Sequence, residues 1–377
     1  MKTKARNRNY TYLYSTTSPA MPCFRALIIL FAILSHHPVL AQAVGTPQHV
    51  GLFESDTVLD LRISGDLKPL MNDRSETPSD HPLMISYSDA GQDHVLSVSM
   101  RTRGHFRKTM GDCDYPPLLI AFHPSDSLSN SIFRGQKKTK LVVPCRDAEY
   151  VIREWLVYRI HAMLTPMGFR ARLVRLTLAD TRTGKAPVTT YAMLLEEEGQ
   201  MAARNKMISV SRDIAPERCE PSTFLDMALF EYFIGNTDWS VQYGQNVKLI
   251  AHDSLSIPFT VPYDFDQCGL VSAPYAHPAE ELQLSSVQVR RYRGYCVKDL
   301  SAFDSSLTKL QHLRPRINDL VNGTTQLSDK TRAQVIRFLD GFYATMADPK
   351  KRQRELSYPC DPNNPGVNVV IRGLRTN

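Results

Sequence analysis

Three carboxylates and an amide of this chain have the types and the spacing of a metal-dependent catalytic site. Asp238 and Asn246 follow an apolar, helix-like segment, and Asp264 and Asp266 end a short β-type run at 257–265. Carboxylate and amide oxygens at the ends of regular elements suit Mg²⁺ or Mn²⁺ and the orientation of a nucleophile. Each residue alone could equally cap a helix or close a turn. As an ordered set they predict a site for metal-assisted chemistry.

The elements expected to position this set change in kind along the chain. Alternating apolar and polar residues, or short apolar runs, predict strands at 58–63, 83–87, 94–100, 117–122, 139–144, 171–178 and 188–195, with one helix at 150–164 among them. After Gly199 helical spacing prevails, first from Pro221 and later at 286–293, 304–320 and 328–346. Strands at 247–250 and 257–265 flank the acidic set. We therefore expect an α+β protein with a β-rich part at 44–198 and an α-rich part at 199–377.

Several short segments of the chain match one family pattern in order. They are Arg101-Thr-Arg103-Gly104, Lys140-Leu-Val-Val, Tyr150-Val-Ile-Arg-Glu154, Met193-Leu-Leu-Glu196, Asn236-Thr-Asp238, Gln245-Asn246 and Tyr263-Asp264-Phe-Asp266. Together they resemble the spore-coat CotH-like kinase family, a secreted branch of kinase-fold enzymes. The resemblance covers roughly residues 96–269, about half of the chain. It implies a bilobal, protein-kinase-like fold with a β-rich N-lobe that holds one helix and an α-rich C-lobe.

The resemblance also implies a reaction, namely phosphoryl transfer from ATP with Mg²⁺ or Mn²⁺ to a hydroxyl group of a protein or a small molecule. Asp238 would orient or deprotonate that hydroxyl. Asn246, Asp264 and Asp266 would hold the metal ion. Phosphoryl transfer depends mainly on positioning and on neutralising charge, so a cation near the phosphates is also required.

The candidates for nucleotide binding come from the β-rich part. Lys140, paired with Glu154 of the following helix, is the first candidate cation, and Arg103 is the second. Glu196 would lie in the connector between the two parts. An ordinary strand-edge lysine and a solvated acidic turn are the alternatives for Lys140 and Glu196. The sequence has no Gly-x-Gly-x-x-Gly phosphate loop, and Arg103-Gly104 is all that stands at that position.

The first 43 residues have the pattern of a secretory signal peptide. Basic residues, an apolar run at 26–34 and Ala41-Gln-Ala43 predict cleavage after Ala43, and the run is too short for a retained membrane span. The whole chain carries a net charge of +7, of which the signal segment contributes five basic residues and no acidic one. The remainder is near +2, so the basic balance does not indicate nucleic-acid binding. We expect an exported protein, periplasmic or extracellular.

Six cysteines remain after the signal segment, and an even count in an oxidising compartment predicts up to three disulfides. They are Cys113, Cys145, Cys219, Cys268, Cys296 and Cys360. Cys113 with Cys145 is the most attractive pair, because each lies at the start or end of a predicted strand. The remaining pairing is open, and the spacing matches no thiolate zinc motif. The basic clusters Arg290-Arg291-Arg293 and Lys350-Lys351-Arg352 are expected on solvated faces or at helix ends.

Two rival functions stay open beside the phosphotransferase. A metal-dependent phosphoesterase would use His252 with Asp238, Asp264 and Asp266, since a histidine among carboxylates suits Mn²⁺, iron or zinc. A catalytically degenerate, secreted binding or envelope module is the other alternative, and the missing glycine-rich loop favours it. The expected partners are accordingly a nucleotide and an unknown acceptor, which could be an envelope or secreted protein.

Overall fold

The computed structural model describes residues 51–104, 106–110, 113–124 and 126–360, and these residues belong to one compact unit. The predicted signal peptide, residues 1–43, lies outside the described residues. The strands are β1 (Leu59–Gly65), β2 (His81–Asp89), β3 (Gln92–Thr102), β4 (Leu118–Phe122), β5 (Lys138–Val142), β6 (Ala171–Asp180), β7 (Val188–Leu195), β8 (Ile208–Val210), β9 (Val247–Ala251) and β10 (Phe259–Pro262). The helices are α1 (Leu67–Asn72), α2 (Phe106–Thr109), α3 (Asp126–Ser129), α4 (Ala148–Leu164), α5 (Glu198–Arg204), α6 (Pro221–Ile234), α7 (Asp304–Gly323), α8 (Asp329–Ala347) and α9 (Pro349–Leu356).

Seven strands close into a barrel in the order β1-β2-β3-β4-β5-β7-β6. Neighbouring strands are antiparallel except β1 and β6, which pair in parallel from Leu59 opposite Val174 to Gly65 opposite Asp180. The period-two pattern places Leu59, Leu61 and Ile63 of β1 in the interior, while the residues between them face outward. The barrel interior is one of the two hydrophobic cores.

The prediction of a bilobal, protein-kinase-like fold with a helical C-lobe is wrong. The structure has a closed, mixed seven-stranded barrel, a second three-stranded sheet, and helices packed beside them. The predicted strands of the first half are present, but apolar alternation says which residues face a core and nothing about which strands pair. The parallel contact between β1 and β6, more than 100 residues apart, closes the barrel, and no local pattern encodes it. The division of the chain at residues 198 and 199 stays a prediction.

The second sheet has the order β10-β9-β8 and contains the hairpin that supports the acidic set. β9 and β10 are antiparallel, with Val247 opposite Pro262. The residues just outside that pair, Asn246 and Tyr263, are joined by a hydrogen bond from Tyr263 N to Asn246 O of 3.0 Å. Strand register therefore fixes the backbone of Asn246 next to the segment that begins Tyr263-Asp264.

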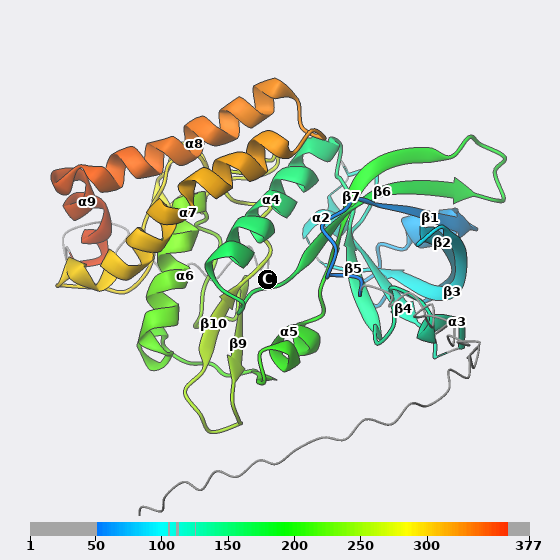
Figure 1. Cartoon of the computed structure of the whole chain (residues 1–377), viewed down its shortest axis with the longest axis horizontal. Helices are drawn as coiled ribbons and strands as arrows, with labels where there is room; N and C mark the ends of the chain where they lie inside the picture. The colour runs from blue at the N-terminus through cyan, green and yellow to red at the C-terminus, as the bar shows by residue number, and fades with distance from the viewer. Residues whose placement is uncertain (1–50, 105, 111–112, 125, 361–377) are drawn as a thin grey trace, which may run out of the picture. The chain divides into compact units, whose positions relative to one another are not determined.

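Helix α4 lies between the barrel and helices α6, α7, α8 and α9 (Figure 1). It contacts β6 and β7 on one side and α7 on the other, and Asp147 caps its first turn by accepting a hydrogen bond from Glu149 N at 2.9 Å. Helix α6 is buried along most of its length, from Phe224 to Ile234. These helices and the outer face of the barrel share the second hydrophobic core.

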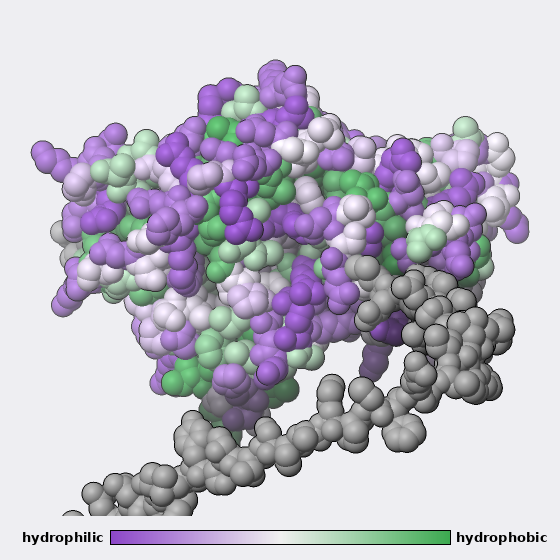
Figure 2. Space-filling model, in the orientation of Figure 1, coloured by the Kyte–Doolittle hydropathy of each residue, from purple (hydrophilic) through white to green (hydrophobic). Residues whose placement is uncertain are grey.

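Helices α7 and α8 are amphipathic and lie side by side, in contact with each other (Figure 1). Their buried residues recur at helical spacing, for example Leu307, Leu310 and Ile317 on α7. Figure 2 shows hydrophilic side chains covering most of the face that these helices present. Of the helices in the described part of the chain, none combines the length and apolar character needed to cross a bilayer.

The predicted disulfide between Cys113 and Cys145 is confirmed. A second disulfide joins Cys296 to Cys360. Cys219 and Cys268 are buried free thiols, so within the described residues two of the three possible bridges are formed. Burial raises the pKa of the Cys219 thiol to about 11, which makes it an unreactive packing residue.

Gly269 lies close to the backbone of Val287 and Gln288, and a substitution there tests the fold. An added Cβ there would meet Val287 O at 2.4 Å and the Phe338 ring at 2.9 Å. We expect Gly269→Ala to lower the free energy of unfolding by about 1–3 kcal/mol, the usual cost of overpacking. Urea unfolding followed by circular dichroism measures it.

Gly323 provides the matched control, because a Cβ at this helix end meets no atom within 4 Å. Gly323→Ala should leave stability unchanged or raise it by up to about 1 kcal/mol through helix propensity. Equal effects of the two substitutions would contradict this packing.

Candidate active site

The acidic set is held at the C-terminal end of α6 and at the open end of the β9–β10 hairpin. Helix α6 ends at Gly235, whose φ of 70° is the left-handed conformation that glycine adopts readily. The Asn236 side chain then accepts a hydrogen bond from Asp238 N at 3.0 Å, an Asx turn that orients the loop. Asn246 is the residue directly before β9, and Asp264 comes two residues after β10.

Asp238 and Asn246 are in direct contact. Asn246 Nδ2 donates to Asp238 Oδ2 at 3.0 Å and to the Asp238 carbonyl at 2.6 Å, and Gln245 Nε2 donates to Asp238 Oδ1. Burial, and then the charge of Asp264, raise the pKa of Asp238 to about 6. At neutral pH Asp238 is therefore an ionised carboxylate poised close to its pKa, as general-base chemistry requires.

Two residues of the site have backbone conformations that are unusual for residues other than glycine. Asn246 has a φ of 50° and Asp264 a φ of 64°. Such strain costs on the order of 1 kcal/mol or more and occurs preferentially at functional positions. At Asp264 the conformation is supported by Tyr158, whose hydroxyl accepts a hydrogen bond from Asp264 N at 2.9 Å.

The Asp264 carboxylate is half-buried, and no hydrogen bond or ion pair from the described residues engages its oxygens. Asp266 is nearly buried and accepts a hydrogen bond from the Tyr275 hydroxyl at 3.2 Å. Burial, and then the charge of Asp264, raise the pKa of Asp266 to about 7. Asp264 is therefore the acidic side chain of this set whose oxygens are free to bind a ligand.

Glu154 of α4 interacts with the same group of carboxylates. It is 2% exposed, and burial together with the charges of Asp266 and Asp264 raises its pKa well above the usual range. The predicted partner Lys140 forms no ion pair with it among the described residues. The cations that act on Glu154 are Arg107 and Arg103, which lower its pKa.

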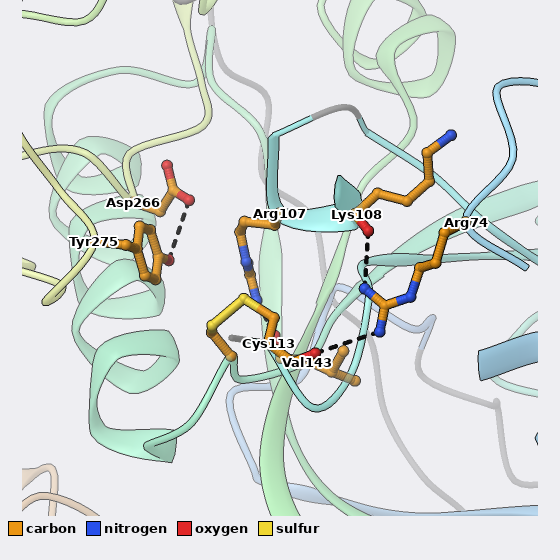
Figure 3. The surroundings of a disulfide bond; sticks show 8 residues. Arg74, Arg107, Lys108, Cys113, Val143, Asp266 and Tyr275 are labelled. Carbon is orange, nitrogen blue, oxygen red and sulfur yellow. Dashed lines mark hydrogen bonds between the residues drawn. A yellow bond between two sulfur atoms is a disulfide. The ribbon is translucent and has the colours of Figure 1, made fainter. Parts of the chain in front are cut away.

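Arg107, which sequence reasoning missed, is the buried counter-charge of the carboxylates. Burial alone would lower its pKa, but Tyr275, Asp266 and Glu154 raise it, and the net shift is upward. In Figure 3 the Arg107 side chain lies next to the disulfide, with the pair formed by Asp266 and Tyr275 to its left. Its guanidinium donates to the carbonyl of Val143, just beyond β5.

The disulfide ties the segment that carries Arg107 to the end of β5. Cys113 is bonded to Cys145, and Asp114 N donates to Cys145 O at 3.1 Å. Arg74 adds two bonds, to the carbonyls of Lys108 at 2.9 Å and Cys113 at 3.3 Å (Figure 3). The predicted cysteine pair was thus a usable signal for Arg107, because it places Cys113, six residues after Arg107, next to the end of β5.

Three further cations gather around Tyr263, beside Asp264. Lys140 Nζ lies 4.9 Å and Lys248 Nζ 5.2 Å from the centre of the Tyr263 ring, and Arg103 lies close enough to influence the pKa of Lys140. Burial, and then the charge of Arg103, lower the pKa of Lys140 to about 8. Lys248 is paired with Glu198 at 3.0 Å, whereas neither the Lys140 nor the Arg103 side chain has a carboxylate partner among the described residues.

Two other predicted residues are placed away from the cluster. Glu196 forms an ion pair with Arg204, with 2.9 Å between Oε2 and Nη2. It also accepts a hydrogen bond from Arg170 N at 3.0 Å, so it connects α5 to the loop before β6. His252 follows the end of β9 opposite to Asn246, and its ring packs on Phe259. The structure therefore does not bring His252 to the aspartates with which the phosphoesterase alternative combined it.

Arg293 was expected on a solvated face or at a helix end, but its side chain donates hydrogen bonds inside the protein. It donates to the carbonyls of Thr237 and Trp239, the latter at 2.8 Å. It also lowers the pKa of Asp238. The segment 286–293 was expected to be helical but is irregular. Arg293 at its end binds the carbonyls on either side of Asp238.

The donor set fits a divalent cation that is shared with a ligand. Within the described residues no group of three or more His, Cys, Asp and Glu side chains is arranged to hold a metal ion. Mg²⁺ needs no such cage, because it is typically bound by one or two carboxylates, substrate phosphates and water. Asp264 and Asn246, whose amide nitrogen is turned to Asp238, leave oxygens for such a role.

No protein-family model matches the chain, and no curated protein matches its sequence.

The pKa of Asp266 makes stability depend on pH in a defined direction. Its folded pKa of about 7 is above the usual value of 3.8, so the folded state binds the proton more tightly than the unfolded state. The stabilising contribution is full below about pH 4 and is lost as the pH rises to about 7. In metal-free buffer, Asp266→Asn should therefore gain stability relative to the wild type between pH 4 and pH 8.

Urea unfolding at both pH values measures this change. The gain should be at most a few kcal/mol, because one pKa unit corresponds to about 1.4 kcal/mol. Asp93→Asn, at an exposed position of β3, is the control and should parallel the wild type. If Asp266→Asn also paralleled the wild type, the coupling of these carboxylates would be refuted.

Proposed function

We propose that this chain is an exported, metal-dependent phosphotransferase that moves a phosphoryl group from ATP to a hydroxyl group of a protein or small molecule. The observation that carries the proposal is that two cations and a carboxylate, none of them in an ion pair among the described residues, lie close together. Cations without carboxylate partners, Arg103 and Lys140, lie beside Asp264, a carboxylate without a hydrogen-bond partner among the described residues. A polyphosphate bound with a divalent metal ion presents the complementary charges to both.

In this proposal the cations bind the phosphate oxygens. Arg103 supplies a planar fork of donors, and Lys140 supplies a mobile ammonium group. The depressed pKa of Lys140, about 8, results mainly from burial. An arriving phosphate would restore the full charge of Lys140, so the cation favours an anionic ligand.

Asn246 and Asp264 would hold the metal ion, with Asp266 behind them. A bound Mg²⁺ or Mn²⁺ would supply electrostatic stabilisation for charge that develops on the phosphate oxygens. Arg107 and Tyr275 act in a supporting layer, since Arg107 lowers the pKa of Asp266 and the Tyr275 hydroxyl donates a hydrogen bond to it. Glu154 belongs to this layer through the charge of Asp266, which raises its pKa.

Asp238 acts as the base in the proposed transfer. Two amides orient its carboxylate, which accepts the proton of the acceptor hydroxyl. The acceptor oxygen forms a bond to the γ-phosphorus while the bond to the bridging oxygen breaks, and ADP leaves. Export agrees with the two disulfides, which persist in oxidising compartments.

Calorimetric titration of residues 44–377 with ATP and Mg²⁺ or Mn²⁺ tests the proposal. Lys140→Met should weaken ATP binding by about 10- to 100-fold, because a hydrogen bond to a charged group contributes about 1.5–3 kcal/mol. Asp264→Asn should abolish the metal dependence of binding. Asp238→Asn should keep ATP binding and lose transfer of labelled γ-phosphate to protein acceptors or water.

Asp253→Asn is the control, since this exposed residue lies in the turn after β9. It should bind and transfer as the wild type does. No ATP binding with either metal, in a folded and oxidised sample, would reject the proposal and favour the non-catalytic envelope module.

A further inference from the structure

A cavity of about 50 Å³ lies between α4, α6, α7 and β10, apart from the cations and carboxylates described above. Its apolar wall consists of Leu164, Met167, Met227, Phe230 and Leu310. One water molecule needs about 10–15 Å³ of such space, so the cavity has room for roughly four waters or for one small organic molecule.

One buried hydroxyl of the cavity lacks a partner. Thr260 of β10 is 4% exposed, and its Oγ1 has no hydrogen-bond partner among the described residues. Leaving such a group unsatisfied costs about 1–3 kcal/mol. A molecule in the cavity that carries a hydroxyl group would satisfy it.

The charges in the lining are balanced. Asp226 pairs with Lys309 at 2.9 Å and accepts a hydrogen bond from the Ser306 hydroxyl. His161 is buried, and burial lowers its pKa to about 4, so its ring is neutral at neutral pH. A charged ligand would lose its hydration here without gaining a counter-charge.

We propose that this cavity is a binding site for a small neutral alcohol whose hydroxyl group bonds to Thr260 and whose apolar body lies against Met167, Met227 and Phe230. The size of the cavity limits the ligand to a short chain or a small ring. Its lining, mostly apolar with a few convergent polar groups, has the character of small-molecule sites in proteins.

The cavity shares a wall with the candidate active site. The Phe230 ring packs against the His161 ring, which also lines the cavity, with 4.7 Å between the ring centres. It also packs against the Phe265 ring, with 5.9 Å between the ring centres. Phe265 directly follows Asp264 in the sequence, and its ring centre lies 4.8 Å from that of Tyr158. Binding of the alcohol does not depend on the proposed phosphotransferase activity, so each can be tested separately.

Methyl NMR of the oxidised chain, residues 44–377, labelled with ¹³C at the methionine methyl groups, tests the site with n-butanol as the probe. The Met167 and Met227 signals should shift saturably, while Met100, in the barrel core, should not. The charged analogues n-butylammonium and butyrate should bind at least tenfold more weakly.

Thr260→Val and Thr260→Ser form the matched pair. Thr260→Val, which lacks the hydroxyl, should bind n-butanol at least about fivefold more weakly, as expected for one hydrogen bond of about 1 kcal/mol. Thr260→Ser should bind n-butanol as the wild type does. If Thr260→Val fails to fold, the charged analogues on the wild type decide. Absence of saturable shifts, equal binding of butyrate, or unchanged affinity in a folded Thr260→Val variant would overturn the proposal.

Discussion

Mutual repulsion of carboxylates at one place is the constraint on which the site depends. Asp238, Asp264, Asp266 and Glu154 come from three parts of the chain. Asp238, Asp266 and Glu154 each have a pKa raised by burial and by a neighbouring carboxylate. Such a cluster is unfavourable unless cations accompany it. Arg107 supplies the buried positive charge, and the disulfide between Cys113 and Cys145 ties its segment to β5. A bound divalent cation would relieve the remaining repulsion.

The scaffold fixes this arrangement through strand register rather than through packing of the side chains themselves. Pairing of Val247 with Pro262 determines the distance between the backbones of Asn246 and Tyr263. Asn246, before β9, and Asp264, after β10, then turn the chain through their left-handed conformations at the open end of the hairpin, and the Tyr158 hydroxyl supports the turn at Asp264. A one-residue slip of β9 against β10 would separate these residues, so the hairpin specifies the site.

Sequence patterns predicted the local features well and the long-range ones poorly. The acidic set follows helix and strand ends, which residue types and periodicity reveal, and the cysteine pair could be read from strand boundaries. Closure of the barrel by β1 and β6 depends on a parallel contact that no local signal encodes. Arg107 and Arg293 were missed because an arginine in a polar or basic segment has the same sequence signature whether it is solvated or buried against carboxylates and carbonyls.

Anomalous diffraction from crystals grown with Mn²⁺ and a non-hydrolysable ATP analogue tests the central claim most directly. The account predicts a manganese peak within about 2.0–2.4 Å of oxygens from Asp264 and Asn246, with the analogue's phosphates against Arg103 and Lys140. Manganese and nucleotide bound elsewhere, or neither bound at saturating concentration, would contradict it.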